Sequence, residues 1–258
     1  MRYSDLGSNW VARNADYKLE YDDVSNMPYV YFSKTDLMAI RRGDSIRIQQ
    51  TTGIYFPTLE LWKGRGGKVA WNDRFELNEQ VFVEFPDTFS IQMNTSLYEV
   101  RQAKLTYTSY FGNEKIDGKF QDKLTGQVAN GEIAFPVFES SEDVLKIDNI
   151  GKGIYFTGGF RLNGLTVYGY GTKTNRATLE IFDDQEKNLL FRGRSELVII
   201  KRGDNLVGDQ VEAVIYNGQD SIYHPSVSVR FNIGEKELQL KRGKRGSDRN
   251  PFLVLATK

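Results

Sequence analysis

Apolar and polar residues alternate over several short stretches of this chain, most clearly in residues 89–93, 178–181, 226–233 and 238–240. Successive side chains of a β-strand point to opposite faces of the sheet, so a period of two describes a strand with one buried face. Less regular apolar runs predict six further strands, at 81–85, 105–110, 165–170, 197–200, 211–216 and 252–255. The pattern therefore predicts an all-β protein.

Short turn sequences separate these stretches. The Asn-Gly pairs at 130–131, 163–164 and 217–218 favour positive φ, which tight hairpins between antiparallel strands require. Helix-forming patterns are confined to residues 33–43, which predict one short capped helix, and residues 141–147, which predict a further turn or two. Because strands do not alternate with helices, the pattern excludes Rossmann, TIM-barrel and P-loop folds.

The architecture that we favour is a β-solenoid or β-helix-like stack of short strands, in which each layer covers the next. An antiparallel two-sheet β-sandwich is the alternative, and the Asn-Gly turns support it. Periodicity does not separate the two, because both bury the same alternating residues. We expect one continuous all-β unit over residues 1–258, with the polar, glycine-rich segment 112–131 as the alternative boundary between 1–111 and 132–258.

The composition supports a large folded core without pointing to a charged partner. Apolar residues make up 40% of the chain and aromatic residues 13%, which argues against disorder. Lys and Arg together number 34, as do Asp and Glu, so the basic excess of a nucleic-acid-binding protein is missing. No run of about 20 apolar residues predicts a transmembrane segment. The first ten residues contain no apolar leader, which leaves both a cytoplasmic and an extracytoplasmic setting open.

Residues that carry catalysis or bind metals are scarce. The chain has no cysteine, which removes disulfides, thiolate metal sites and cysteine nucleophiles. Its one histidine, His224, excludes any site that needs two. Pro225 follows it and favours an extended backbone, so we expect a structural histidine at a turn or strand end. The sequence therefore predicts no catalytic residue, no metal site and no cofactor.

Acidic residues are the remaining candidates for chemistry. Asp183, Asp184 and Glu186 lie between two predicted strands. The two carboxyl groups of a glycoside hydrolase stand about 5–10 Å apart across a cleft and come from different strands of a β-scaffold, so this cluster is more typical of a hairpin turn. A polysaccharide hydrolase or lyase stays as our third hypothesis.

Four aromatic residues are the candidate ligand-binding residues. Trp62 and Trp71 flank a glycine-rich loop at 64–67, and Tyr168 and Tyr170 lie on one face of a predicted strand. Exposed planar side chains provide stacking surfaces for sugar rings. These residues predict a glycan-binding module if they are exposed, and core packing if they are not.

Three segments carry a resemblance to known proteins: WKGRGGKVAW at 62–71, KIDGKFQDK at 115–123 and DSIYHP at 220–225. With them, most of the chain resembles a segment of the very long, β-rich, uncharacterised envelope or surface proteins of Bacteroidota-type bacteria. That resemblance implies part of a longer chain, an extracytoplasmic location and an elongated β-architecture, and it assigns no functional residue. The strand rhythm of residues 211–240 also resembles that of the groove-forming lipid-transport proteins of the envelope.

The leading hypothesis is a non-catalytic structural or interaction module of a large cell-envelope or surface protein. Its partners would be the rest of its own longer chain or another envelope protein. A glycan-binding module, with polysaccharide as the partner, is the second hypothesis. In neither case do we expect nucleic acid as a partner.

Overall fold

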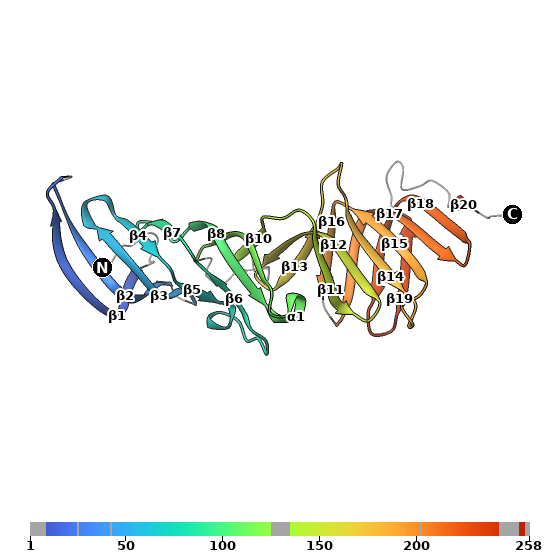
Figure 1. The fold of residues 1–258 in the computed structure, drawn as a ribbon, viewed down its shortest axis with the longest axis horizontal. Helices are drawn as coiled ribbons and strands as arrows, with labels where there is room; N and C mark the ends of the chain where they lie inside the picture. Colours follow the sequence, from blue (N-terminus) through green and yellow to red (C-terminus); the bar gives the residue numbers. More distant parts are fainter. Residues whose placement is uncertain are drawn as a thin grey trace. The chain divides into compact units, whose positions relative to one another are not determined.

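The structure is a computed structural model that describes residues 9–24, 26–41, 43–124, 135–201, 203–242 and 253–255. The chain divides into two compact units, Met1–Glu139 and Ser140–Lys258 (Figure 1). The division follows Glu139, whereas the part of segment 112–131 that is described forms a strand within the first unit. The units are described separately below.

The all-β class is confirmed. Besides strands, the described residues contain one helical turn, α1 (Thr108–Phe111), and the 3-10 turns η1 (Pro57–Leu59) and η2 (Trp71–Asp73). Strands with a described register pair antiparallel in both units. These pairings do not show the favoured solenoid, and they are compatible with the antiparallel two-sheet alternative.

The described part of the first unit contains nine strands, with a tenth at the point of division. They are β1 (Asn9–Asp22), β2 (Met27–Arg41), β3 (Asp44–Phe56), β4 (Leu61–Arg65), β5 (Lys68–Ala70), β6 (Val81–Glu84), β7 (Thr88–Gln92), β8 (Tyr98–Tyr107), β9 (Lys115–Asp122) and β10 (Val137–Ser140). The long strand β3 belongs to two sheets, because residues 52–56 pair with β4 while Gln49 pairs with β5. We call them the β4 sheet (β1, β2, β3, β4, β7) and the β6 sheet (β3, β5, β6, β8, β9).

In the second unit, three strands are shared between two sheets in the same way. Its strands are β11 (Leu145–Gly151), β12 (Ile154–Asn163), β13 (Thr166–Tyr170), β14 (Ala177–Phe182), β15 (Leu189–Ser195), β16 (Leu197–Lys201), β17 (Asn205–Asn217), β18 (Asp220–Asn232), β19 (Glu237–Arg242) and β20 (Leu253–Leu255). One half of β12, β17 and β18 lies in a sheet with β11, β14, β15 and β20, the β15 sheet. The other half lies with β13, β16 and β19, the β16 sheet.

The shared strands bend where they pass from one sheet to the other, and local chemistry explains each bend. In β12 the turn falls at Gly158 and Gly159, whose missing Cβ atoms make room for the ring of Tyr170 and the side chain of Ala177. In β17 it falls at Gln210, which has φ 54° beside a register shift. In β18 it falls at Pro225. The long strands therefore fold the antiparallel sheet over on itself, with the apolar side chains inside.

His224 stabilises the bend in β18. Its side chain is buried, and its Nδ1 accepts a hydrogen bond from the backbone N–H of Ser226 at 3.1 Å. Pro225, between the two residues, has no backbone N–H. The next N–H along the chain, that of Ser226, is satisfied by the imidazole. The histidine is buried and hydrogen-bonded, as a structural role requires, but it lies inside β18 and not at the turn or strand end that the sequence predicts.

Both helix predictions are wrong. Residues 33–41 belong to β2, and residues 145–147 begin β11. Leu37 and Ala39 pair with strands on both sides and are buried in the core. Burying these side chains in a sheet stabilises the chain more than a short helix does, because a short helix nucleates poorly. The glycines of the predicted turns at 163–164 and 217–218 have positive φ, as expected, and the pair at 130–131 lies outside the described residues.

Candidate functional site: an apolar cleft in the second unit

A cleft of about 570 Å³ lies between the β15 sheet and the β16 sheet. Apolar side chains form its walls, namely Ile154, Ile181, Phe182, Leu190, Phe191, Ile215, Tyr216, Phe231, Ile233 and Leu238. Charged side chains complete the lining, namely Lys152, Asp183, Asp184 and Lys236. Its volume falls within the range of about 300–1,000 Å³ that is usual for small-molecule sites.

Strand register explains why one wall is continuous. Ile154 lies opposite Ile181, Ile181 opposite Phe191, and Phe191 opposite Ile215, so four neighbouring strands contribute one row of inward side chains. The first three are buried, whereas Ile215 on β17 is half-buried. The row is therefore buried on β12, β14 and β15 and becomes partly exposed on β17.

The opposite wall of the cleft is also a row of side chains that lie opposite one another on neighbouring strands. In the β16 sheet, Leu206 lies opposite Phe231, and Phe231 lies opposite Leu238. Leu206 and Phe231 are buried, while Leu238 on β19 is half-buried. The cleft is thus the part of the intersheet core that the described side chains leave unfilled, on the side of β17, β18 and β19.

Two turns meet at the mouth of the cleft. The β18–β19 turn carries Lys236, whose ammonium group is ion-paired with Asp184 in the β14–β15 turn. This hydrogen-bonded contact lowers the pKa of Asp184. Within the β14–β15 turn, hydrogen bonds from the backbone N–H of Lys187 and the side chain of Asn188 lower the pKa of Asp183.

These interactions fix the chemistry of the mouth. Asp183 holds the β14–β15 turn together, which confirms the interpretation of residues 183–185 as a hairpin turn. Both carboxylates are ionised at neutral pH, whereas a general acid must keep its proton near the working pH. The cleft therefore combines a largely apolar interior with charges of both signs at its opening.

The predicted aromatic residues do not lie in this cleft. Trp62 and Trp71 are both 0% exposed in the first unit, so neither offers a ring face to a sugar. The indole of Trp62 covers the backbone of Gly53, where a Cβ atom would stand 2.4 Å from the ring. Tyr168 and Tyr170 are half-buried on β13, and the ring of Tyr170 packs over Gly159.

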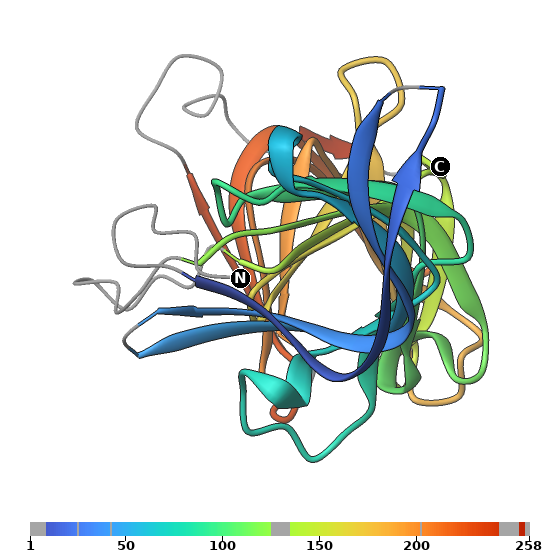
Figure 2. The ribbon, with the colours of Figure 1, turned by 90° about the vertical axis from the view of Figure 1, so that its left-hand side faces the viewer.

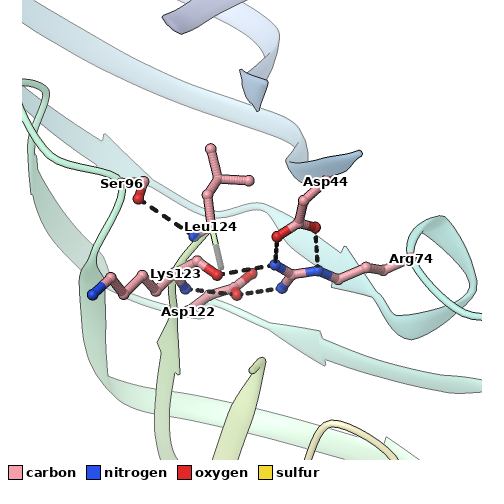
Figure 3. A network of polar contacts seen from close by, with 6 residues as sticks. All are labelled: Asp44, Arg74, Ser96, Asp122, Lys123 and Leu124. Carbon is pink, nitrogen blue, oxygen red and sulfur yellow. Dashed lines mark hydrogen bonds and ion pairs between the residues drawn. The ribbon is translucent and has the colours of Figure 1, made fainter. Parts of the chain in front are cut away.

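A second cluster, of polar residues, lies in the first unit (Figure 3). The Arg74 guanidinium donates to both oxygens of Asp44, to Asp122 Oδ1 at 2.7 Å and to the backbone carbonyl of Lys123 at 2.9 Å. Asp122 Oδ1 also accepts the backbone N–H of Lys123, at 2.7 Å. Arg74 thereby joins the start of β3 to the end of β9.

Burial sets the electrostatics of that cluster. Removal from water raises the pKa of Asp122 to about 6, and the neighbouring positive charge of Arg74 opposes this only in part. Burial, together with the negative charge of Asp122, also raises the pKa of Tyr98 well above its usual value. The four hydrogen bonds that Arg74 donates all go to protein acceptors, so the cluster acts as a structural clamp between three chain segments.

Other kinds of site gain no support from the described residues. Within them, no three His, Cys, Asp or Glu side chains are arranged to hold a metal ion, and no helix has the length and apolar character to cross a bilayer. Comparison of the chain with protein-family models, curated proteins and solved structures gives no match. Function is therefore inferred from the geometry of the two units.

Proposed function

We propose that this protein is a non-catalytic binding module whose second unit holds the aliphatic chain of an amphiphile between its two sheets. The unfilled apolar core between the β15 sheet and the β16 sheet carries the proposal. An uncovered apolar surface is unfavourable in water at roughly 25 cal/mol per Å², so a ligand that covers it gains affinity.

The form of the cleft favours an amphiphile over a fully apolar or a fully polar ligand. Its walls come from Ile, Leu and Phe side chains and the ring of Tyr216, which offer a hydrocarbon tail dispersion contacts and, apart from the Tyr216 hydroxyl, offer a sugar no hydrogen bonds. At the mouth, Lys152 and Lys236 lie near two carboxylates. A polar headgroup at that point keeps its contact with water and with charged partners, while the tail is buried.

The wider setting in this proposal follows from the sequence. An amphiphile-binding module suits a protein of the cell envelope, which is the extracytoplasmic location that the resemblance implies. The favoured partners, the rest of a longer chain or another envelope protein, belong to the same proposal. No observation in the structure favours the glycan-binding or hydrolase hypotheses over it.

The direct test is titration of the full chain with cis-parinaric acid, a fluorescent fatty acid whose emission rises in apolar surroundings. We expect saturable binding and displacement by a single-chain lysophospholipid. Ile215→Gln places an amide in the cleft and should weaken binding at least tenfold. A buried amide without partners costs on the order of 1–3 kcal/mol, and tenfold is 1.4 kcal/mol.

Val214→Gln is the matched control. Val214 is the neighbouring residue on β17, is also half-buried, and points to the opposite face of the strand. It should bind the probe as the unchanged chain does. Equal binding by both variants, or binding that never saturates, would show that the cleft is not the site.

A further inference from the structure

A third turn, between β11 and β12, contributes a charged side chain to the mouth of the cleft. The cleft lies between the two sheets that share the long strands β17 and β18, which are orange in Figure 2. Residues 152–153 form the β11–β12 turn and join the paired residues Gly151 and Ile154. The side chain of Lys152 is exposed and lines the cleft.

Gly153 holds this turn against the β14–β15 turn. Its carbonyl oxygen accepts the backbone N–H of Phe182 at 2.8 Å. It has φ 73°, and a Cβ atom at this position would stand 3.2 Å from the carbonyl oxygen of Phe182 and 3.3 Å from that of Asp183. Glycine thus allows the two turns to pack backbone against backbone, which fixes where the side chain of Lys152 begins.

The two carboxylates that line the mouth already have partners within the protein. Asp183 accepts hydrogen bonds with both oxygens, from its own turn, as described above. Asp184 is ion-paired with Lys236. Both carboxylates are therefore committed to contacts that hold the turns together.

Lys152 is not committed in this way. Within the part of the chain that the structure describes, its ammonium group forms no ion pair. Its positive charge nevertheless reaches the mouth, because it adds to the larger effect of Lys236 in lowering the pKa of Asp184. The lining contains two positive and two negative groups, so its formal charges cancel. What distinguishes the mouth is a free donor and no equally free acceptor.

The next carboxylates along the same turns do not change this balance. Glu186 accepts a hydrogen bond from the Tyr155 hydroxyl, and Glu235 accepts one from the side chain of Asn232 at 3.0 Å. Neither glutamate lines the cleft. A headgroup at the mouth therefore meets the ammonium group of Lys152 as the charged group without a protein partner.

From these contacts we infer that the headgroup of the ligand is anionic, and that Lys152 selects it by donating to its carboxylate or phosphate oxygens. The inference rests on the proposed amphiphile site and adds the sign of the charge that this site prefers. Hydrogen bonds between ionised groups are stronger than those between neutral groups. Because the mouth is open to water, which screens the attraction, the selectivity is modest.

Competition between ligands with one tail and three headgroups tests the preference. N-phenyl-1-naphthylamine, an uncharged fluorescent probe, is bound to the full chain and displaced by decanoate, decanol or decyltrimethylammonium at neutral pH and low salt. We expect decanoate to bind about three- to fivefold more tightly than decanol, and decyltrimethylammonium to bind most weakly. Equal affinity for all three overturns this inference alone. Displacement by none of them overturns the amphiphile site and the inference with it.

Substitution of Lys152 tests its role as the selecting residue. Lys152→Gln should lower the affinity for decanoate to about that for decanol and leave the affinity for decanol unchanged. Lys152→Glu should reverse the order of decanoate and decyltrimethylammonium. Lys146→Gln is the matched control, since Lys146 is an exposed lysine on β11 outside the cleft lining. An equal loss of decanoate affinity at Lys146, or none in Lys152→Gln, contradicts the assignment.

Discussion

Lys236 is ion-paired with Asp184, and this contact joins the β18–β19 turn to the β14–β15 turn at the mouth of the cleft. The two residues lie 52 positions apart in the sequence and belong to opposite walls of the cleft. Both side chains are largely exposed, so water screens their attraction. The contact can therefore open and close without unfolding either sheet.

Removal of this ion pair should change how fast a ligand leaves and leave the fold intact. In Lys236→Ala, we expect dissociation of cis-parinaric acid to accelerate by up to about fivefold, the limit set by the strength of exposed ion pairs. Stopped-flow displacement by unlabelled fatty acid measures the rate. Lys201→Ala, an exposed lysine outside the cleft lining, is the control, and an equal acceleration there would refute a gating role.

Asp122 should make the protein less stable as the pH rises. Its pKa in the folded state is about 6, above the ordinary value of 3.8, so its contribution to stability is present below pH 3.8 and is lost as the pH rises through about 6. Relative to Asp122→Asn, the unfolding free energy of the unchanged chain should fall by on the order of 3 kcal/mol from about pH 4 to pH 7. Urea unfolding of both proteins at both pH values measures this change. If the difference in unfolding free energy between the unchanged chain and Asp122→Asn is the same at pH 4 and pH 7, the prediction is contradicted.

Gly53→Ala should destabilise the first unit because Trp62 occupies the space of the new methyl group. Overpacking of this kind costs typically about 1–3 kcal/mol. Gly234→Ala is the control, since its nearest atom would be the side-chain oxygen of Asn232 at 3.6 Å. We expect a change within about 0.5 kcal/mol there. Thermal or urea unfolding compares the two, and similar stability for both would count against close packing at Gly53.

Asp36→Ala should destabilise the pairing of β2 with β3 beside its register shift at Thr35. The Asp36 carboxylate accepts the backbone N–H of Gln50 at 2.9 Å and the Arg47 side chain at 2.8 Å. Without it, a part-buried N–H loses its partner, at a cost of about 1–3 kcal/mol. Asp36→Asn keeps one acceptor and should lose less. An alanine variant as stable as the asparagine variant would show that the hydrogen bonds matter little.

Much of the fold could be predicted from the chain, because side-chain alternation is a local property. The strands predicted at 81–85, 165–170, 178–181, 197–200 and 238–240 correspond to β6, β13, β14, β16 and β19. Asp36 shows the limit of that reasoning. In the sequence it resembles a residue of a helix cap, but in the structure it satisfies a donor on another strand. Only the tertiary pairing decides between these roles.

The candidate site was less accessible to sequence reasoning. Alternation places Ile215, Phe231 and Leu238 on inner faces, yet it does not reveal that the space between them is unfilled. For Trp62, the sequence suggested a binding residue where the structure has a core residue. A tryptophan beside glycines is compatible with both a stacking surface for sugars and a packed core. The glycines at 53 and 64 were the informative signal, because they leave room for an indole.

Methyl NMR of the full chain, with labelled isoleucine side chains and saturating palmitate, tests the central claim most directly. We expect intermolecular contacts from the palmitate chain to Ile181, Ile215 and Ile233, which line the cleft, and none to Ile46 or Ile48 in the core of the first unit. Contacts confined to the first unit, or none at all at saturation, would contradict the assignment of the cleft as an amphiphile site.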